Sequence, residues 1–266
     1  MPELPEVEVM RGYFTEAVLN LQIADVEFLD PLNKVFQSPK DLIYKNLIGH
    51  AFTDTHRIGK YLFARISNGR WLHLHFGMTG SLQVYNDDYS QPKYTRLAIH
   101  FEDGSRLAFI DSRKFGRVEI VDSPDTYQEN HKLGTDLLHI KPADFVKALQ
   151  NRKVAIKTAL LDQKHFAGIG NWIADEMLFE VGIHPEEPCE KLSENELKAL
   201  LKSAVEIVKT AIREDTHYGS FPDDFFVNYR KKGAIHPDHP HSKVASLRVG
   251  GRGTFIVPEK QKLKQG

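Results

Sequence analysis

The sequence contains little cysteine and no long apolar stretch. Cys189 is the single cysteine among 266 residues, so an intrachain disulfide and a cysteine-based zinc site are both excluded. No run of 18 apolar residues occurs, which excludes a membrane-spanning helix. The N-terminal stretch is acidic and has no apolar signal core. We therefore expect a cytoplasmic protein with no membrane partner.

The formal net charge of −1 conceals a basic C-terminal end. Residues 227–266 contain nine Lys or Arg and two acidic residues, a charge of +7, whereas residues 1–226 contain 26 basic and 34 acidic residues, a charge of −8. A basic end on an acidic chain is typical of proteins that bind a polyanion, most often nucleic acid. A solvated, frayed terminus has the same composition, so the charge alone leaves both interpretations open.

Residue patterns in the first half predict a helix followed by antiparallel strands. Apolar residues at three- and four-residue spacing predict a helix over residues 5–19. Asn68-Gly69 and Asp103-Gly104 are each flanked by short apolar segments, a strong signal for β-hairpins. The strands expected are 61–66, 71–76, 81–85, 97–101, 106–110 and 117–121. Many short strands with tight turns favour a sandwich or barrel.

The second half reads as helical. Residues 123–136 are expected to be a linker, followed by helices over 142–150, 154–162 and 171–181, the last one ended by Gly182. Ser193 and Glu196 have capping-box spacing and predict a helix to about residue 212. Strands at 247–249 and 254–257 flank a glycine-rich hairpin tip at 250–253. The chain length fits two domains, at about 100–200 residues per domain.

The N-terminus offers a possible nucleophile. Pro2 is a small residue of the kind from which the initiator methionine is normally removed, which would leave a free amine beside Glu3 and Glu6. An α-amino group has a pKa of about 7.7–8.0, so a useful fraction is unprotonated near neutrality. Such an amine attacks aldehyde-like carbons, and a nearby carboxylic acid can supply a proton. Proline and acids are also common at helix starts, so chemistry alone does not decide.

Basic side chains along the chain are weaker candidates. Lys60 follows a glycine at the start of a strand, and His73 and His75 point to one face of the next strand. That face either contacts phosphates or is the solvated side of a sheet. Lys157 lies in an apolar helical run, where lysines often extend out to solvent.

Two loops complete the candidates. Gly168-Ile169-Gly170-Asn171 precedes a predicted helix, where Asn171 can cap the helix and backbone N–H groups can bind an anion. Arg113 and Phe115, in the loop at 111–116, form a cation–aromatic pair of the kind that wedges between stacked bases. Both loops can equally be ordinary turns.

Together these segments resemble the formamidopyrimidine-DNA glycosylase family, which includes endonuclease VIII. The resemblance is carried in chain order by residues 2–8, 59–62, 75–80, 111–116, 155–157, 168–171 and 250–255. It implies an α+β multidomain fold. The expected parts are a two-layer β-sandwich in residues 1–130, a helix–two-turns–helix domain in 131–230 and a zinc-finger-type β-hairpin in 231–266.

The resemblance also implies residue roles. Pro2 would be the nucleophile at the sugar C1′ atom, and Glu3 would be the acid that opens the sugar ring, supported by Glu6. Lys60 completes the catalytic set. The other residues expected to contact DNA phosphates are His75, Lys157, Asn171 and Arg252, and those expected to fill the gap left by the everted nucleotide are Met78, Arg113 and Phe115.

The zinc ligands of typical family members are absent. His236 and His239 stand at the first ligand pair, but Val257 and Lys260 stand at the second. Two histidines cannot close a tetrahedral site, since structural zinc takes four ligands. We therefore expect a zincless finger and no cofactor. His241 lies nearby, so adventitious metal binding by these histidines stays an open alternative.

Two further departures concern the lesion site. The segment between Glu214 and Tyr229 is shorter than in typical 8-oxoguanine-removing members, and Ile173 stands where many members have tyrosine. The resemblance still implies a bifunctional DNA glycosylase and AP lyase. It would excise oxidised bases of the formamidopyrimidine or 8-oxoguanine type from damaged double-stranded DNA in base excision repair, with β,δ-elimination.

We expect it to act as a monomer in a bacterial-type cytoplasm, associated with the nucleoid. The alternatives are an endonuclease VIII-like enzyme for oxidised pyrimidines and a non-catalytic module that binds damaged DNA. The presence of Pro2, Glu3 and Lys60 favours an enzyme.

Overall fold

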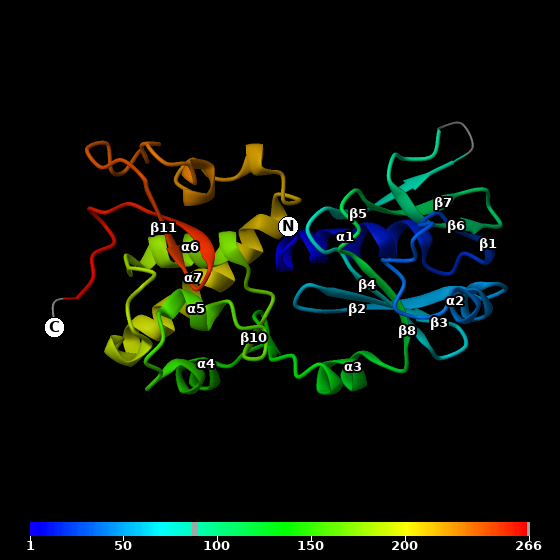
Figure 1. Ribbon diagram of the computed structural model, residues 1–266, viewed down its shortest axis with the longest axis horizontal. Coiled ribbons are helices and arrows are strands. Elements are labelled where there is room, and N and C mark those ends of the chain that lie inside the picture. The colour runs from blue at the N-terminus through cyan, green and yellow to red at the C-terminus, as the bar shows by residue number, and fades with distance from the viewer. Residues whose placement is uncertain (87–89, 265–266) are drawn as a thin grey trace. The chain divides into compact units, whose positions relative to one another are not determined.

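The computed structural model describes residues 1–86 and 90–264 and divides into two compact units. We call Met1–Lys132 the N-terminal unit and Leu133–Gly266 the C-terminal unit. Figure 1 shows the elements of both in chain order, from blue to red. Among the helices of the described residues, none has the length and apolar character needed to cross a membrane.

The N-terminal unit is a β-sandwich of two four-stranded antiparallel sheets. The first sheet has the order β1 (Ile23–Phe28), β6 (Thr95–Phe101), β7 (Arg106–Asp111), β5 (Gly80–Tyr85). The second has the order β2 (Phe52–Ile58), β3 (Tyr61–Ile66), β4 (Trp71–His75), β8 (Arg117–Val121). Two helices, α1 (Leu4–Val18) and α2 (Lys40–Leu47), accompany the sheets.

A single apolar cluster holds α1 to the sandwich. Val7, Phe14 and Val18 lie on one face of α1 at helical spacing and are fully or almost fully buried. The Phe14 ring meets the Phe52 ring of β2 edge to face, with centroids 5.1 Å apart. Burial of each such side chain contributes about 1.5–3 kcal/mol, so α1 is fixed to the strands around which the site is built.

The predicted helix at 5–19 and both predicted hairpins are confirmed. β3 and β4 pair around Asn68-Gly69, and β6 and β7 pair around Asp103-Gly104. The sequence patterns did not reveal β1, β2 or α2. The apolar–polar alternation that marks a half-buried strand is missing in β2, because two of its buried residues, Thr55 and Arg57, are polar and its register shifts between Phe52 and Asp54.

The predicted linker at 123–136 is wrong in part, because it contains a helix, α3 (Pro124–Asn130). The Ser123 hydroxyl accepts a hydrogen bond from the Thr126 N–H at 3.1 Å, and proline occupies the first helical position. Ser123 and Pro124, which suggested a linker in the sequence, therefore begin a helix. Tyr127 fixes α3 to the sheet, with its ring 4.3 Å from the His73 ring.

The C-terminal unit is mainly helical. Its helices are α4 (Pro142–Leu149), α5 (Ile156–Leu160), α6 (Asn171–Val181) and α7 (Glu194–Arg213), with short 3₁₀ turns at Cys189–Lys191, Tyr218–Ser220 and Phe226–Tyr229 and a two-residue parallel pairing of β9 (Thr135–Asp136) with β10 (Phe166–Ala167). Helix α7 packs against α6 and α4 through its apolar face. The predicted capping box at Ser193 and the glycine stop at Gly182, whose φ is +77°, are both confirmed.

Helix α5 is shorter than the predicted 154–162. The Cys189 N–H donates to the Val154 carbonyl at 3.1 Å, and Ala155 forms an antiparallel bridge with Pro188. Contacts between distant segments therefore occupy the start of this run and delay the helix. No local pattern encodes them.

A β-hairpin closes the C-terminal unit and lies against α6 (Figure 1). Its strands are β11 (Ala245–Val249) and β12 (Arg252–Ile256). The predicted four-residue tip is wrong, because Arg252 pairs with Val249 and only Gly250 and Gly251 turn. Both glycines have positive φ, +54° and +77°, as a tight two-residue hairpin turn requires.

Candidate functional site

The N-terminal residues form the start of α1. Pro2 directly precedes Glu3, which is the N-cap residue and is only 2% exposed. The Glu3 N–H donates to Glu6 Oε2 at 2.9 Å, so the two glutamates are held together by capping-box geometry. Pro2, Glu3 and Glu6 therefore occupy fixed positions at one helix end.

Lys60 is tied to α1 by a chain of hydrogen bonds. It lies in the β2–β3 turn after Gly59 and is 9% exposed. Arg57 donates to the Gly59 carbonyl at 3.0 Å and to Glu8 Oε2 at 2.7 Å. Burial alone would raise the pKa of the Glu8 carboxyl, but hydrogen bonds and charges from Arg11 and Arg57 lower it to about 2. This ionised carboxylate holds the Lys60 turn to the helix that carries Glu3.

His73 and His75 do not lie on the solvated face that one interpretation of the sequence predicted. His73 is fully buried, and Tyr61 packs against both imidazoles at 5.6 and 5.0 Å between centroids. Burial is the main cause that lowers the pKa of His75 to about 3, and the nearby positive charges of Arg117 and Lys60 add to it. His75 is therefore a neutral imidazole at physiological pH.

Asp111 organises two loops of the N-terminal unit. This fully buried carboxylate accepts hydrogen bonds from the Thr79 hydroxyl at 2.6 Å, the Arg113 N–H at 3.1 Å and the Gly116 N–H at 2.7 Å. The Arg113 N–H also donates to Thr79 Oγ1 at 3.2 Å. Turn 76–80 and loop 111–116, which lie far apart in sequence, are thus joined at one buried group.

The joined loops present three side chains to solvent. Met78 is 42% exposed and Phe115 is 53% exposed, so two large apolar side chains of the joined loops face solvent. The Arg113 guanidinium lies 5.0 Å from the Phe115 ring centroid. Within loop 111–116, Lys114 is anchored to buried Asp30 at 2.6 Å. Exposed apolar groups on a rigid base are suited to insertion between stacked bases.

In the C-terminal unit, the predicted cap role of Asn171 is wrong. Gly170 is the N-cap of α6 and Asn171 is its first residue. Because the Asn171 side chain donates to the Gly253 carbonyl at 3.0 Å, it connects the helix to the hairpin instead of closing the helix end. Arg252, beside Gly253 in β12, is exposed.

Lys157 does not extend to solvent. Its side chain is fully buried and its ammonium group contacts Asp175 at 2.5 Å, Thr254 Oγ1 at 2.7 Å and the Gly253 carbonyl at 3.3 Å. An ammonium group has three N–H donors, and the protein itself supplies these three acceptors. Lys157 of α5 therefore holds strand β12 of the hairpin in place.

The residues at the expected zinc positions have other partners. The two ring nitrogens of buried His236 lie 2.9 Å from the Asp224 carbonyl and 3.2 Å from the Asp238 N–H. Val257 is fully buried in an apolar cluster with Phe179 and Phe226. Among the described residues, no group of three or more His, Cys, Asp or Glu side chains has an arrangement that could hold a metal ion.

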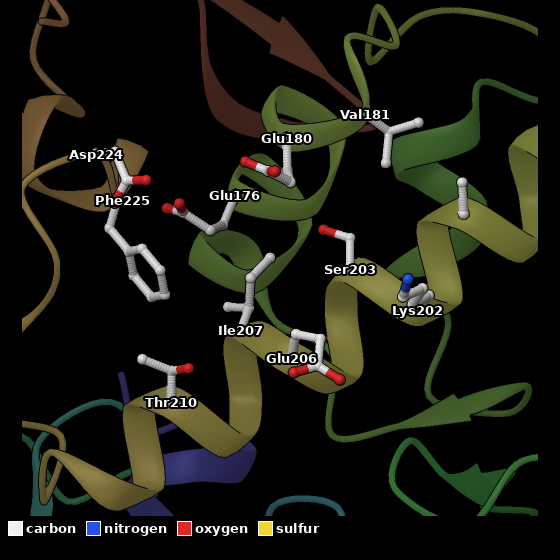
Figure 2. Close-up of a pocket in the computed structure, with 11 residues that line it drawn as sticks. Glu176, Glu180, Val181, Lys202, Ser203, Glu206, Ile207, Thr210, Asp224 and Phe225 are labelled. Atoms are coloured by element: carbon white, nitrogen blue, oxygen red, sulfur yellow. The ribbon is translucent and has the colours of Figure 1, made fainter. Parts of the chain in front are cut away.

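A cavity of about 460 Å³ lies elsewhere in the C-terminal unit, between α6, α7 and the segment at 224–225 (Figure 2). Four acidic side chains line it, namely Glu176, Glu180, Glu206 and Asp224. Burial raises the pKa of Glu176 to about 8, and the other three carboxylates repel phosphates, so this cavity does not suit DNA.

The two units contribute different parts of the expected set. The N-terminal unit holds Pro2, Glu3, Glu6, Lys60, His75, Met78, Arg113 and Phe115, and the C-terminal unit holds Lys157, Asn171 and Arg252. Sequence reasoning missed the residues that position this set, above all Asp111, Asp175 and the Glu8–Arg57 pair. Of these residues, only Asp111 had a recognisable sequence signal, because an aspartate in a turn often accepts hydrogen bonds from backbone N–H groups.

Comparisons with known proteins match each unit to a known domain family. Residues 1–118 match the family model described as the formamidopyrimidine-DNA glycosylase N-terminal domain, and residues 133–222 match its H2TH domain. The chain is 35% identical to formamidopyrimidine-DNA glycosylase of Ligilactobacillus salivarius, over 99% of this chain and 100% of that protein. It is 33% identical to the enzyme of that name from Arabidopsis thaliana, over 99% of this chain and 71% of that protein.

Solved structures give the same result. The fold is similar to Lactococcus lactis formamidopyrimidine-DNA glycosylase non-covalently bound to DNA containing an AP site, with a TM-score of 0.88 and 28% identity over 98% of this chain and 100% of that one. A second similar structure is MutM in complex with DNA containing carbocyclic 8-oxoG, with a TM-score of 0.87 and 29% identity over the same shares.

Proposed function

The chain belongs to the formamidopyrimidine-DNA glycosylase family and is a DNA glycosylase of base excision repair, and we propose that it removes the damaged base with its own N-terminal amine and then cleaves the strand as an AP lyase. One observation carries the proposal. Pro2 directly precedes the buried Glu3 in the unit that also presents Met78, Arg113 and Phe115 to solvent.

The proposed reaction begins at the Pro2 nitrogen, which becomes a secondary amine when Met1 is removed. The amine attacks C1′ of the damaged nucleotide while the bond from C1′ to the base breaks, and the base leaves with that electron pair and takes up a proton. Protonation of the ring oxygen then opens the sugar and leaves an iminium between Pro2 and C1′. We assign that proton to Glu3, with Glu6 holding the backbone beside it.

The iminium makes strand cleavage possible. It acidifies C2′, so that loss of a C2′ proton expels the 3′ phosphate, and a second elimination expels the 5′ phosphate. Water then hydrolyses the iminium and restores the amine. Pro2 thus enters and leaves the cycle unchanged, and the reaction needs no cofactor.

DNA is the partner, and we propose how its backbone is held. Phosphates would be contacted by Lys60, His75, Asn171 and Arg252, which position the strand without reading its sequence. His75 would act as a neutral hydrogen-bonding group, given its lowered pKa. The fully buried Lys157 would contribute through the hairpin it supports.

The exposed residues of the joined loops would occupy the space that the target nucleotide leaves. A base must leave the stack before an amine reaches its sugar, and filling the gap offsets part of the unstacking cost of a few kcal/mol. Met78, Arg113 and Phe115 are suited to this task because Asp111 holds both loops in place.

We propose that the lesions are oxidised purines of the formamidopyrimidine and 8-oxoguanine type, that the protein acts as a monomer, and that it works on the bacterial-type nucleoid in the cytoplasm. The Pro-Glu-Leu-Pro-Glu opening and the full-length match to formamidopyrimidine-DNA glycosylases support the lesion class. Size-exclusion chromatography with light scattering tests the monomer.

The experiment for the proposed function compares duplex oligonucleotides that carry a single formamidopyrimidine, 8-oxoguanine or oxidised pyrimidine. The purified protein is expected to release the purine lesions and to nick the strand at both sides of the abasic sugar, and Glu3→Gln is expected to lose both steps. Faster release of the oxidised pyrimidine would favour an endonuclease VIII-like specificity. Binding without release from any substrate would identify a non-catalytic module.

A further inference from the structure

A buried aspartate connects four segments of the C-terminal unit. Asp175 lies one turn after Asn171 on α6, and its carboxylate is fully buried. Oδ1 contacts the Lys157 ammonium of α5 at 2.5 Å, and Oδ2 accepts from the Arg230 guanidinium at 2.7 and 3.0 Å. Each carboxylate oxygen thus holds a different cation.

Both cations reach the hairpin. Lys157 donates to Thr254 Oγ1 at 2.7 Å and to the Gly253 carbonyl at 3.3 Å, and the Arg230 guanidinium lies 5.6 Å from the Phe255 ring centroid. These contacts fall on three consecutive residues of β12, directly after Arg252.

The same end of the hairpin is tightly confined in two other ways. Asn171 adds a second hydrogen bond to the Gly253 carbonyl. A β-carbon at Gly250 would lie 2.6 Å from Thr158 Oγ1, so the turn rests directly on α5. Thr254 Oγ1, which accepts from Lys157, also donates to the Arg252 carbonyl at 3.3 Å, so Lys157 is connected to the backbone of Arg252 by two successive hydrogen bonds.

We infer that Asp175 is a positioning residue for DNA binding, which holds Lys157 and Arg230 under β12 and thereby places Arg252 against the phosphate backbone. The inference rests on the proposed phosphate contact of Arg252. It goes beyond that proposal because it assigns a role in DNA binding to a buried acid that does not touch DNA. Burial of an ion pair does not by itself indicate a role in stability, because proteins in which apolar residues replace such a pair are often as stable.

The direction in which Asp175→Asn changes the DNA affinity distinguishes a positioning role of Asp175 from a simple effect of its charge. Removing a negative charge from a DNA-binding protein strengthens its attraction to phosphates. Positioning predicts the opposite for Asp175→Asn, because the amide NH₂ cannot accept a hydrogen bond, so either Lys157 or Arg230 loses its acceptor and the support for β12 is weakened. Glu180→Gln is the matched control, since Glu180 lies on the same helix but is exposed.

The experiment measures duplex DNA affinity by fluorescence anisotropy at several salt concentrations. The variants are Asp175→Asn, Thr254→Val, Glu180→Gln, Arg252→Ala and the double variant Asp175→Asn/Arg252→Ala. Arg252→Ala is expected to weaken binding roughly tenfold and to flatten the plot of log K against log salt by about one unit. Asp175→Asn is expected to produce most of both effects, Thr254→Val a smaller share, and Glu180→Gln unchanged or tighter binding.

The double variant is expected to bind little worse than Arg252→Ala alone, because both changes remove the same contact between Arg252 and a phosphate. Thr254→Val keeps every charge and is nearly isosteric, and it removes both the Lys157 contact and the hydroxyl's own hydrogen bond to the Arg252 carbonyl at 3.3 Å. Wild-type binding in this variant would therefore overturn the inference even if Asp175→Asn does not fold. Wild-type affinity in Asp175→Asn and Thr254→Val, with weakened binding in Arg252→Ala, would overturn the inference and leave the proposed function intact. Wild-type affinity in Arg252→Ala would remove the phosphate contact itself and the inference with it.

Discussion

Gly77 lies so close to Phe115 that a β-carbon at position 77 would be 2.5 Å from the Phe115 carbonyl carbon and 2.7 Å from its oxygen. Gly77 also has a φ of +57°, a conformation that other residues adopt only with strain. The turn that carries Met78 and the loop that carries Phe115 therefore touch through their backbones. This contact and the Asp111 hydrogen bonds make one rigid surface from two segments.

Gly77→Ala is expected to separate the two loops and to reduce base excision from duplex DNA. The control is Gly104→Ala in the β6–β7 turn, where φ is +86° but no heavy atom lies within 4 Å of the added carbon. Strain alone should cost the control about 1–2 kcal/mol of unfolding free energy, and the clash should add to this for Gly77. Denaturant unfolding and single-turnover excision measure both effects. Equal losses of excision in the two variants would contradict the account.

Arg113→Ala is expected to slow excision of a damaged base more than cleavage at a ready-made abasic site. The reason is that Arg113 acts when a base must leave the stack, and an abasic site has no base to remove. Single-turnover rates on matched duplexes with a lesion or an abasic site give the comparison. If both rates fall by the same factor, Arg113 acts in the chemistry or in general binding instead.

Acid is expected to destabilise the protein through His75. The pKa of folded His75 is about 3, against about 6.5 in the unfolded chain, so its stabilising contribution is complete above pH 6.5 and declines as the pH falls toward 3. At pH 5 the loss from this residue is about 2 kcal/mol. Urea unfolding at pH 7.5 and 5.0 should therefore show a smaller difference in His75→Gln than in the wild type.

The control for this pH effect is His56→Gln, because the His56 side chain is exposed. It should retain the pH dependence of the wild type. An unchanged pH dependence in His75→Gln would show that His75 is not held neutral in the fold.

The hairpin is expected to be stabilised by apolar packing in place of zinc. Val257→Ala should lower the unfolding free energy by about 2 kcal/mol, because it removes two methyl groups from a fully buried position, whereas exposed Val154→Ala should change it little. Elemental analysis should find no stoichiometric zinc, and a chelator should leave the melting temperature unchanged. One tightly bound zinc per chain, with unfolding by chelator, would overturn this prediction.

Local signals predicted much of the fold. Asn68-Gly69 and Asp103-Gly104 form tight turns, in which each glycine has a positive φ, between strands that are neighbours in sequence. The Ser193 capping box likewise acts over three residues. Helix α5 and the α3 start were predicted less well. The start of α5 depends on contacts of residues 154–155 with residues 188–189, and the start of α3 uses residue types that also break helices.

The site was predicted through its exposed and reactive residues but not through the groups that position them. Asp111 reaches Thr79 across 32 residues, and Lys157 reaches Thr254 across 97. Such pairings depend on the packed structure, and no spacing rule in one sequence reveals them. The sequence therefore indicated the proposed chemistry, whereas its supporting network required the fold.

Borohydride trapping on abasic duplex DNA, with the attachment site mapped by mass spectrometry, tests the central claim most directly. Reduction converts the iminium into a stable covalent bond and so marks the nucleophile. Pro2→Gly keeps an amine with altered geometry and should lower the yield, and protein that retains Met1 should form no adduct, because its Pro2 nitrogen is an amide. The account predicts a single adduct on the Pro2 nitrogen of the processed protein. An adduct mapped to Lys60 or another lysine, or full-yield trapping by Met1-retaining protein, would contradict it.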